Sequence, residues 1–388
     1  MIGPTGFAAA AAFVTGTTTE PLHGVRVLDM ATVMAAPSSA RYLADFGAEV
    51  IKVEAPQGDP ARRIGWHADS DPDTFLWKIV GRNKRPVTLD LSQPDARKTF
   101  LTLVDDADVL IENMRPGKLE KLGMAPEILL ARNPRLVILR VTGFGQDGPY
   151  AAQPGFATIA EAMSGYANIS GEADGGPLLP PIAITDEVAG IVGAFATMVA
   201  LWHARETGEG QVVDVSLIET LLQLMGPLIP AYVHLGYQQP RMGSKLPWTV
   251  PRGTYECADG RWIALSASSD GVAKRLLDCI GVGTDERFLT FDDRMTNSDV
   301  LEELVTDWVG QHSSEEAIAA LRDVDAAVGP VYSIADVVED PHFRARNIFV
   351  EVDGVVMPNV VARLSRTPGQ IHHAGLARSG EDVTWSRE

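Results

Sequence analysis

Strand-like and helix-like segments alternate along the first 150 residues of the chain. The hydrophobic pattern predicts β-strands at residues 25–30, 49–54, 85–91, 108–113 and 136–142. Between them it predicts helices at residues 37–46, 93–107 and 125–133, and a short helix opened by Pro116. Right-handed βαβ units place helices on both faces of a mostly parallel sheet. We therefore expect a doubly wound α/β domain with at least five strands.

A second pattern centres on residues 188–202, which are apolar on nearly all sides and predict a helix buried in the core. The stretch is shorter than the roughly 20 residues that a membrane span needs. Residues 182–184 predict a short β segment before it. Asp186 therefore lies where an extended segment enters the first turn of a helix, and there the free amide groups and the helix dipole favour an ionised carboxylate. This position fits either a helix N-cap or a nucleophile held ionised at the edge of the core.

A glycine motif, G-x-G-x-x-G, covers residues 143–148 directly after a predicted strand. A dinucleotide site would require a helix to begin at this motif. Pro149 and Pro154 follow instead, and the next helical pattern starts near Phe156. We therefore reject a nicotinamide or flavin site. Gly143 and Gly145 are instead candidates for backbone that approaches a ligand at the carboxyl edge of the sheet.

Composition narrows the function further. The chain has 388 residues, 45% of them hydrophobic and 22% charged, as in an ordinary globular protein of about two domains. Its net charge of −18 argues against nucleic acid or an anionic membrane as a partner. Its two cysteines indicate neither a disulfide framework nor a metal site, and we expect a cytoplasmic protein. We interpret residues 1–21 as a leader without a secretory signal.

Basic residues gather in the first third of this acidic chain. They include Arg62, Lys78, Arg82, Lys84, Arg85, Arg115, Lys118 and Lys121. They form either a solvated surface or, at the ends of the predicted strands, a site for a ligand with several phosphates.

Several motifs together resemble those of the family III coenzyme A transferases. They are residues 22–29 (LHGVRVLD), 47–54 (GAEVIKVE), 82–85 (RNKR), 108–113 (DVLIEN), 115–117 (RPG), 142–150 (TGFGQDGPY), 210–217 (GQVVDVSL) and 329–332 (GPVY). The resemblance runs from Leu22 to about residue 360 in the order of the family. It also covers the related α-methylacyl-CoA racemases.

The resemblance implies a Rossmann-like large domain with a parallel sheet, a smaller inserted α+β domain and an interlocked homodimer. In this chain the large domain would take residues 22–225 and 329–388, and the small domain residues 226–328. A predicted hairpin at residues 253–265 and predicted helices at residues 218–238, 270–279, 299–311 and 314–322 agree with an insertion. The run of glycines that formyl-CoA transferases carry here as a lid is missing from residues 243–248, so specificity for formyl or oxalyl groups gains no support.

The resemblance also implies the site residues. Asp186 matches the family's essential aspartate, which would move coenzyme A (CoA) between an acyl-CoA and a carboxylic acid through an anhydride, with no permanently bound cofactor or metal. The implied CoA contacts are Val33, Met34, Ala35, Ala55, Arg62, Leu89, Asn113, Met114, Lys121 and Phe156. Ala55 stands where some members carry an arginine.

Two other functions were weighed. A racemase pairs the aspartate with a histidine, because proton exchange needs acids or bases on both faces of an enolate. Phe156 stands in the position of that histidine and cannot exchange a proton, and Glu161 is the one nearby carboxylate suited to compensate. A non-catalytic acyl-CoA binder would have no need of Asp186. Transfer is therefore the favoured interpretation.

Overall fold

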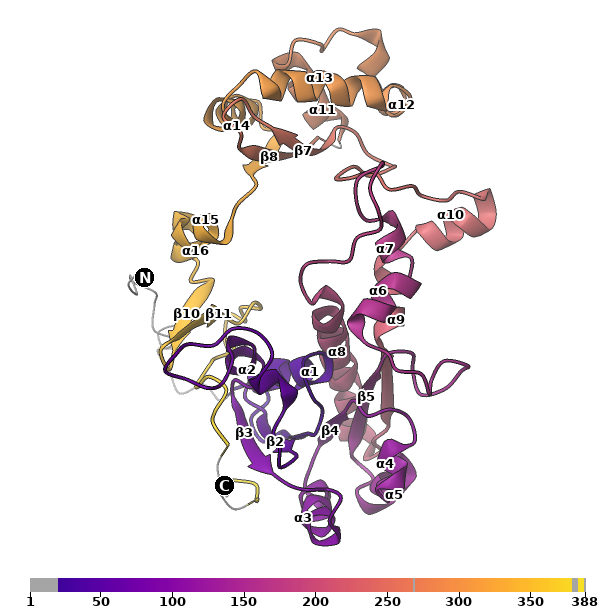
Figure 1. The fold of residues 1–388 in the computed structure, drawn as a ribbon, viewed down its shortest axis with the longest axis vertical. Helices are drawn as coiled ribbons and strands as arrows, with labels where there is room; N and C mark the ends of the chain where they lie inside the picture. The colour runs from indigo at the N-terminus through magenta and orange to yellow at the C-terminus, as the bar shows by residue number, and fades with distance from the viewer. Residues whose placement is uncertain (1–19, 268, 379–382, 387–388) are drawn as a thin grey trace. The chain divides into compact units, whose positions relative to one another are not determined.

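The computed structural model describes residues 20–267, 269–378 and 383–386, and most of the predicted leader lies outside these residues. The chain forms two compact units (Figure 1). Of the described residues, the larger unit contains those up to Tyr166, residues 179–226 and those from Pro341 onward, whereas the smaller unit contains those within 167–178 and 227–340.

A parallel sheet of six strands forms the centre of the larger unit. Its strands are β1 (Arg26–Asp29), β2 (Glu49–Glu54), β3 (Lys84–Thr88), β4 (Val109–Glu112), β5 (Val137–Thr142) and β6 (Val212–Ser216). They lie in the order β3-β2-β1-β4-β5-β6, and each neighbouring pair is parallel. The predicted doubly wound α/β fold is thus confirmed. The sixth strand was absent from the predicted strands, although its Val-Val-Asp-Val pattern suits one.

Both faces of this sheet are covered, because successive strand residues point to opposite sides. Val27 and Val109 belong to one apolar core, and their neighbours Leu28 and Leu110 belong to another. The first core contains residues of α1 (Ala35–Ala44), α8 (Ile184–Thr207) and α9 (Leu217–Leu224). The second contains residues of α3 (Pro94–Asp105), α4 (Lys118–Lys121) and α5 (Pro126–Arg132).

Helix α8 is longer than the apolar pattern indicated, because it begins at Ile184 and ends at Thr207. The predicted β segment at residues 182–184 is therefore wrong. Two glycines let α8 pack closely on α1. A Cβ atom at Gly190 would lie 2.7 Å from the Ser38 Cβ, and one at Gly193 would lie 2.5 Å from the Ser39 Oγ. By length and composition alone, α8 is long and apolar enough to span a membrane. Core helices of soluble proteins can be equally long and apolar.

The larger unit has further short elements, namely η1 (Pro60–Arg62), α2 (Phe75–Val80), α6 (Ala157–Met163), α16 (Pro341–Ala345) and the antiparallel pair β10 (Phe349–Val352) and β11 (Val355–Pro358). No helix follows the glycine motif until α6 begins at Ala157, in agreement with the rejected dinucleotide site.

The smaller unit is built on an antiparallel sheet of β7 (Arg252–Glu256), β8 (Trp262–Ser266) and β9 (Ala327–Pro330). Its helical elements are α10 (Leu228–Leu235), α11 (Asp270–Cys279), η2 (Glu286–Phe288), α12 (Phe291–Thr296), α13 (Ser298–Gly310), α14 (Ser314–Asp323) and α15 (Ile334–Glu339), and α7 (Tyr166–Ile169) lies at its first boundary. The predicted helix at residues 218–238 is in fact two helices, α9 and α10, interrupted near Gly226 and Pro227. Because β9 pairs with β8, the chain returns to the larger unit at Pro341 and not at residue 329.

Candidate active site

The candidate site lies at the carboxyl edge of the parallel sheet. The strand order reverses between β1 and β4, so the loops that follow these strands diverge and leave a crevice. A cavity of about 950 Å³ lies there. The loops after β1, β4 and β5, the start of α6 and the first turn of α8 form its wall. Ligands of doubly wound folds commonly bind at such a crevice.

Asp186 lines this cavity from the third residue of α8. Ala183 occupies the N-cap position, so the interpretation of Asp186 as an N-cap is wrong. Within the described part of the chain, no group donates a hydrogen bond to the Asp186 carboxylate. A carboxylate that faces a cavity without a partner is available to act as a nucleophile.

Burial raises the pKa of the Asp186 carboxyl, and the negative charges of Glu161 and Glu187 raise it as well, so that together they bring it to about 6. The helix dipole of α8, which the sequence analysis expected to favour the ionised carboxylate, is therefore outweighed at this position by burial and the two negative charges. The carboxylate is still mostly ionised at neutral pH, and a base of this pKa is a stronger nucleophile than an ordinary aspartate.

The two neighbouring carboxylates differ from Asp186 because both are engaged. Glu161 is 4% exposed and accepts a hydrogen bond of 2.7 Å from the Thr185 hydroxyl. Glu187 accepts hydrogen bonds from Arg41 at 2.9 Å and from the Tyr42 hydroxyl at 3.0 Å. Glu161 is not part of the cavity wall, so its position does not suit it to replace the missing histidine of a racemase.

The loop between β1 and α1 contributes Val33, whose φ of 70° is unusual for a residue that is not glycine. A β-branched residue in this conformation costs about 1–3 kcal/mol, so the surrounding structure must hold it. The Val33 amide donates to Asp59 Oδ1 at 3.1 Å. Asn113 fixes the preceding residue, because its side chain bonds both the amide and the carbonyl of Thr32, at 2.9 and 2.8 Å.

Gly143 and Gly155 let two backbone segments cross at the cavity. A Cβ atom at Gly143 would lie 2.6 Å from the Gly155 Cα, so neither position has room for a side chain. Gly143 lines the cavity, whereas the Gly145 amide donates to the Thr142 hydroxyl at 3.0 Å and is already used. Of the two glycines expected to approach a ligand, the structure thus retains Gly143.

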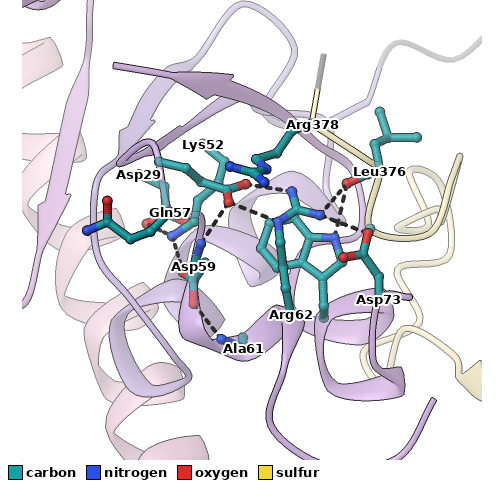
Figure 2. A network of polar contacts seen from close by, with 12 residues as sticks. Asp29, Lys52, Gln57, Asp59, Ala61, Arg62, Asp73, Leu376 and Arg378 are labelled. Carbon is teal, nitrogen blue, oxygen red and sulfur yellow. Dashed lines mark hydrogen bonds and ion pairs between the residues drawn. The ribbon is translucent and has the colours of Figure 1, made fainter. Parts of the chain in front are cut away.

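The basic residues divide into two groups. Arg115 and Lys118 are exposed and line the cavity. Arg62 does not line it, because its guanidinium is bound to Glu54 at 2.6 Å and to Asp73 at 2.8 Å and lies 3.7 Å from the centre of the Trp77 ring (Figure 2). The structure therefore gives Arg62 protein partners in place of the expected phosphate.

The structure brings together seven of the eleven site residues expected from sequence, which are Val33, Met34, Ala35, Asn113, Met114, Phe156 and Asp186. The other four, Ala55, Arg62, Leu89 and Lys121, lie outside this cavity wall. Ala55 and Leu89 directly follow β2 and β3 at the same edge of the sheet, and Lys121 is exposed at the end of α4.

Sequence reasoning did not select several polar residues of the cavity wall. Thr32, Gln153 and Thr158 have no motif of their own. Arg115 and Lys118 belonged to the noted basic group but were not chosen as contacts. The sequence did contain a signal for these two residues, because they flank Pro116 and Gly117 shortly after a predicted strand.

This arrangement defines a doubly wound α/β protein in which the carboxylate of Asp186 faces a cavity at the switch point of the sheet. Residues 22–382 match the model of CoA-transferase family III. The chain therefore belongs to the family III CoA-transferases, enzymes that transfer CoA and use CoA thioesters as substrates.

Curated relatives and solved structures agree with this family. The chain is 38% identical to the succinyl-CoA–L-malate CoA-transferase alpha subunit of Chloroflexus aurantiacus, over 93% of this chain and 87% of the relative. It is 34% identical to the succinate–glutarate CoA-transferase of Agrobacterium fabrum, over 90% and 88%. A crystal structure of a CAIB/BAIF family protein from Brucella suis matches with a TM-score of 0.82 and 31% identity, over 93% of this chain and 97% of that one.

Proposed function

We propose that this enzyme moves CoA from an acyl-CoA thioester to a carboxylic acid, with Asp186 as the nucleophile. The observation that carries the proposal is the Asp186 carboxylate, which faces the cavity without a hydrogen-bond partner from the described residues. Its neighbours Glu161 and Glu187 are both engaged, so Asp186 is the carboxylate free to react.

Four reversible displacements make up the reaction. An Asp186 oxygen attacks the thioester carbonyl, the C–S bond breaks, and an aspartyl anhydride and CoA thiolate form. The thiolate attacks the aspartyl carbonyl, which releases the donor acid and leaves an aspartyl-CoA thioester. The acceptor carboxylate attacks this thioester, the C–S bond breaks, and a second anhydride and CoA thiolate form. The thiolate then attacks the acceptor carbonyl and regenerates Asp186. A hydroxyl nucleophile would instead stop at a stable ester.

The residues of the cavity wall support this chemistry. Arg115 and Lys118 are placed to meet phosphate groups of CoA, and Gly143 offers backbone close to the reacting carbonyl. Phe156 also lines the cavity and has no exchangeable proton, which favours transfer over racemisation. Beyond the CoA ester, the proposed reaction requires no cofactor.

Short dicarboxylic acids are the proposed substrates. Relatives that act on succinyl-CoA with L-malate, on succinate with glutarate and on succinyl-CoA with mesaconate share 33–38% identity with this chain. Mass spectrometry of CoA esters should show CoA transfer from succinyl-CoA to acids of this class. Transfer only to monocarboxylic acids would overturn the substrate assignment.

We propose a cytoplasmic homodimer in which a second copy covers the outer face of α8. One face of α8 packs on α1, but Ile191, Phe195, Val199 and Trp202 form an exposed stripe at helical spacing, with Phe195 and Trp202 each 70% exposed. An apolar stripe of this length is typical of a protein interface. The family resemblance supports a second copy as its partner. Interlocked subunits would separate only together with loss of structure, which sedimentation at increasing denaturant concentration would detect.

Trapping the covalent intermediate tests the nucleophile. During incubation with acyl-CoA, hydroxylamine should convert Asp186 to its hydroxamate, and peptide mass spectrometry should locate the change. The same treatment without acyl-CoA is the control. A hydroxamate on another residue, or labelling that does not depend on acyl-CoA, would contradict the proposal.

A further inference from the structure

The loop that connects β1 with α1 lines the cavity, yet it has no regular secondary structure of its own. Side chains from other segments hold its backbone. Asn113 bonds the amide and carbonyl of Thr32, Lys52 donates to the carbonyl of Ala31, and Asp59 accepts from the amide of Val33. The conformation of this wall of the cavity is therefore set by side chains.

Val33 is the residue of this loop that most needs such support. Its φ of 70° lies in the left-handed region, which β-branched residues avoid. An isolated loop would leave this conformation, and the Val33 amide would turn away with it. The hydrogen bond to Asp59 Oδ1 opposes that change, because it forms only when the amide points at the carboxylate.

Asp59 is itself rigidly held (Figure 2). It is 2% exposed and forms an ion pair of 2.9 Å with Lys52, which is 1% exposed. Its carboxylate also accepts from the Ala61 amide at 2.8 Å, and its own amide donates to Glu54 at 2.8 Å. Burial alone would raise the pKa of Asp59, but Lys52 and the two amides lower it below its ordinary value, so the carboxylate stays charged.

Two buried lysines and two buried aspartates balance each other in this cluster. Lys52 also lies 3.6 Å from Asp29, and Lys84 lies 2.8 Å from the other oxygen of Asp29. A buried ion pair contributes little to stability compared with apolar residues of the same size, whereas it can fix one geometry. The geometry fixed here is that of the cavity wall, because Asp59 and Lys52 both bond the loop.

We propose that Asp59, held by Lys52, is a positioning residue for the CoA thioester: it fixes the left-handed conformation of Val33 and with it the cavity wall that receives the ligand. Asp59 is not part of the cavity wall and acts only through the loop. The role in CoA binding depends on the proposed function, whereas the role in holding the loop does not.

The test compares Asp59→Ala with Asp45→Ala. Asp45 is a matched control, because it is 1% exposed and bound to buried Arg82 at 2.5 Å, and its carboxylate accepts hydrogen bonds from Arg82 and Asn83, which lie outside the loop. Asp59→Ala should raise the Kd for CoA and the KM for acyl-CoA at least tenfold and change kcat less than threefold. Asp59→Asn, which keeps an acceptor for the Val33 amide, should recover part of the affinity. Asp45→Ala should leave Kd and KM within twofold of the wild type, even if it melts earlier.

Two further measurements distinguish a local change in the loop from general misfolding of the variant. Hydrogen exchange of the peptide that contains residues 30–34 should speed up at least tenfold in Asp59→Ala, which removes the acceptor of the Val33 amide, and stay unchanged in Asp45→Ala. Val33→Gly added to Asp59→Asn should recover at least threefold of the lost affinity, because glycine adopts this φ without strain.

Equal Kd values for Asp59→Ala and Asp45→Ala, or unchanged loop exchange in Asp59→Ala, would overturn the positioning role. A wild-type enzyme that binds no CoA would instead overturn the proposed function and the ligand role together. The exchange measurement would then still decide whether Asp59 holds the loop.

Discussion

Replacing Asp186 by asparagine should abolish transfer and at the same time stabilise the protein at neutral pH. The amide keeps the size of the side chain but cannot form an anhydride, so turnover should fall by several orders of magnitude. It also removes a charge that the fold does not compensate, because burial and two nearby carboxylates raise the pKa of Asp186 to about 6. Loss of activity together with a gain in stability distinguishes a reactive group from a structural one.

The size of the gain follows from linkage between protonation and folding. Raising the pKa of Asp186 from 3.8 to about 6 corresponds to a penalty of about 3 kcal/mol, at 1.36 kcal/mol per pKa unit. Partial solvent exposure screens this penalty, and the dipole at the start of α8 offsets about 0.3–1 kcal/mol of it. We therefore expect Asp186→Asn to gain about 1–2 kcal/mol of unfolding free energy above pH 6.

The pH determines how far the stability of the wild type falls below that of Asp186→Asn. A carboxyl with a raised pKa binds its proton more tightly in the folded protein than in the unfolded chain. Below about pH 4 Asp186 is neutral in both states, so wild type and variant should be equally stable. Between about pH 4 and pH 6 the unfolded chain loses its proton first and the wild type becomes progressively less stable than the variant. Above pH 6 the difference should be constant.

Thermal melting of both proteins from pH 4 to pH 8, read as a difference at each pH, would measure this effect. Glu187→Gln is the matched control in the same helical turn. It should lower the melting temperature at neutral pH, because it breaks the ion pair with the nearly buried Arg41. If Asp186→Asn melts below the wild type at pH 8, or if the difference does not change with pH, the burial argument is wrong. If it transfers CoA at nearly the wild-type rate, the nucleophile is wrong.

Three more outcomes are expected. Transfer by the wild type should rise with pH around pH 6, as Asp186 ionises, and a rate independent of pH between 5 and 7 would contradict the raised pKa. Calorimetry should show that CoA binding weakens as the salt concentration rises. Exchanging Arg115 and Lys118 for glutamine should weaken binding and make it less dependent on salt. An unchanged salt dependence would exclude them as phosphate contacts. Phe195→Asp with Trp202→Asp should disrupt the dimer in sedimentation, while a double variant that remains dimeric would place the interface elsewhere.

Local sequence determined strands β1 to β5 of the larger unit and the helices between β1 and β2, β3 and β4, and β4 and β5. Val50, Ile51, Val109 and Leu110 form continuous apolar runs, which strands buried on both faces require, and the helices between them have amphipathic patterns. The short edge strand β6 was missed because its first residues are exposed and its run is interrupted by Asp214. The observed start of α8 at Ile184 differs from the start of the apolar pattern at residue 188, because the first turn of α8 is not uniformly apolar.

The sequence pattern placed Asp186 at the start of a long apolar helix, and the family resemblance implied that it belongs to the site. The raised pKa of Asp186 could not be predicted from the sequence. The sequence shows the helix dipole, but the opposing effects of burial and of Glu161 arise only when α6 and α8 come together. The sum of these effects raises the pKa where the sequence argument expected an ionised group at its ordinary strength.

Positive charge alone did not reveal which basic residues line the cavity. Arg62, Arg115 and Lys118 look alike in sequence as cations that follow strands. Folding places Arg62 against Glu54, Asp73 and the Trp77 ring, and leaves Arg115 and Lys118 exposed at the cavity. The reason is physical: periodicity reports which residues are buried, whereas the partner of a buried charge is chosen by segments far apart in the chain, which only the tertiary structure brings within hydrogen-bond distance.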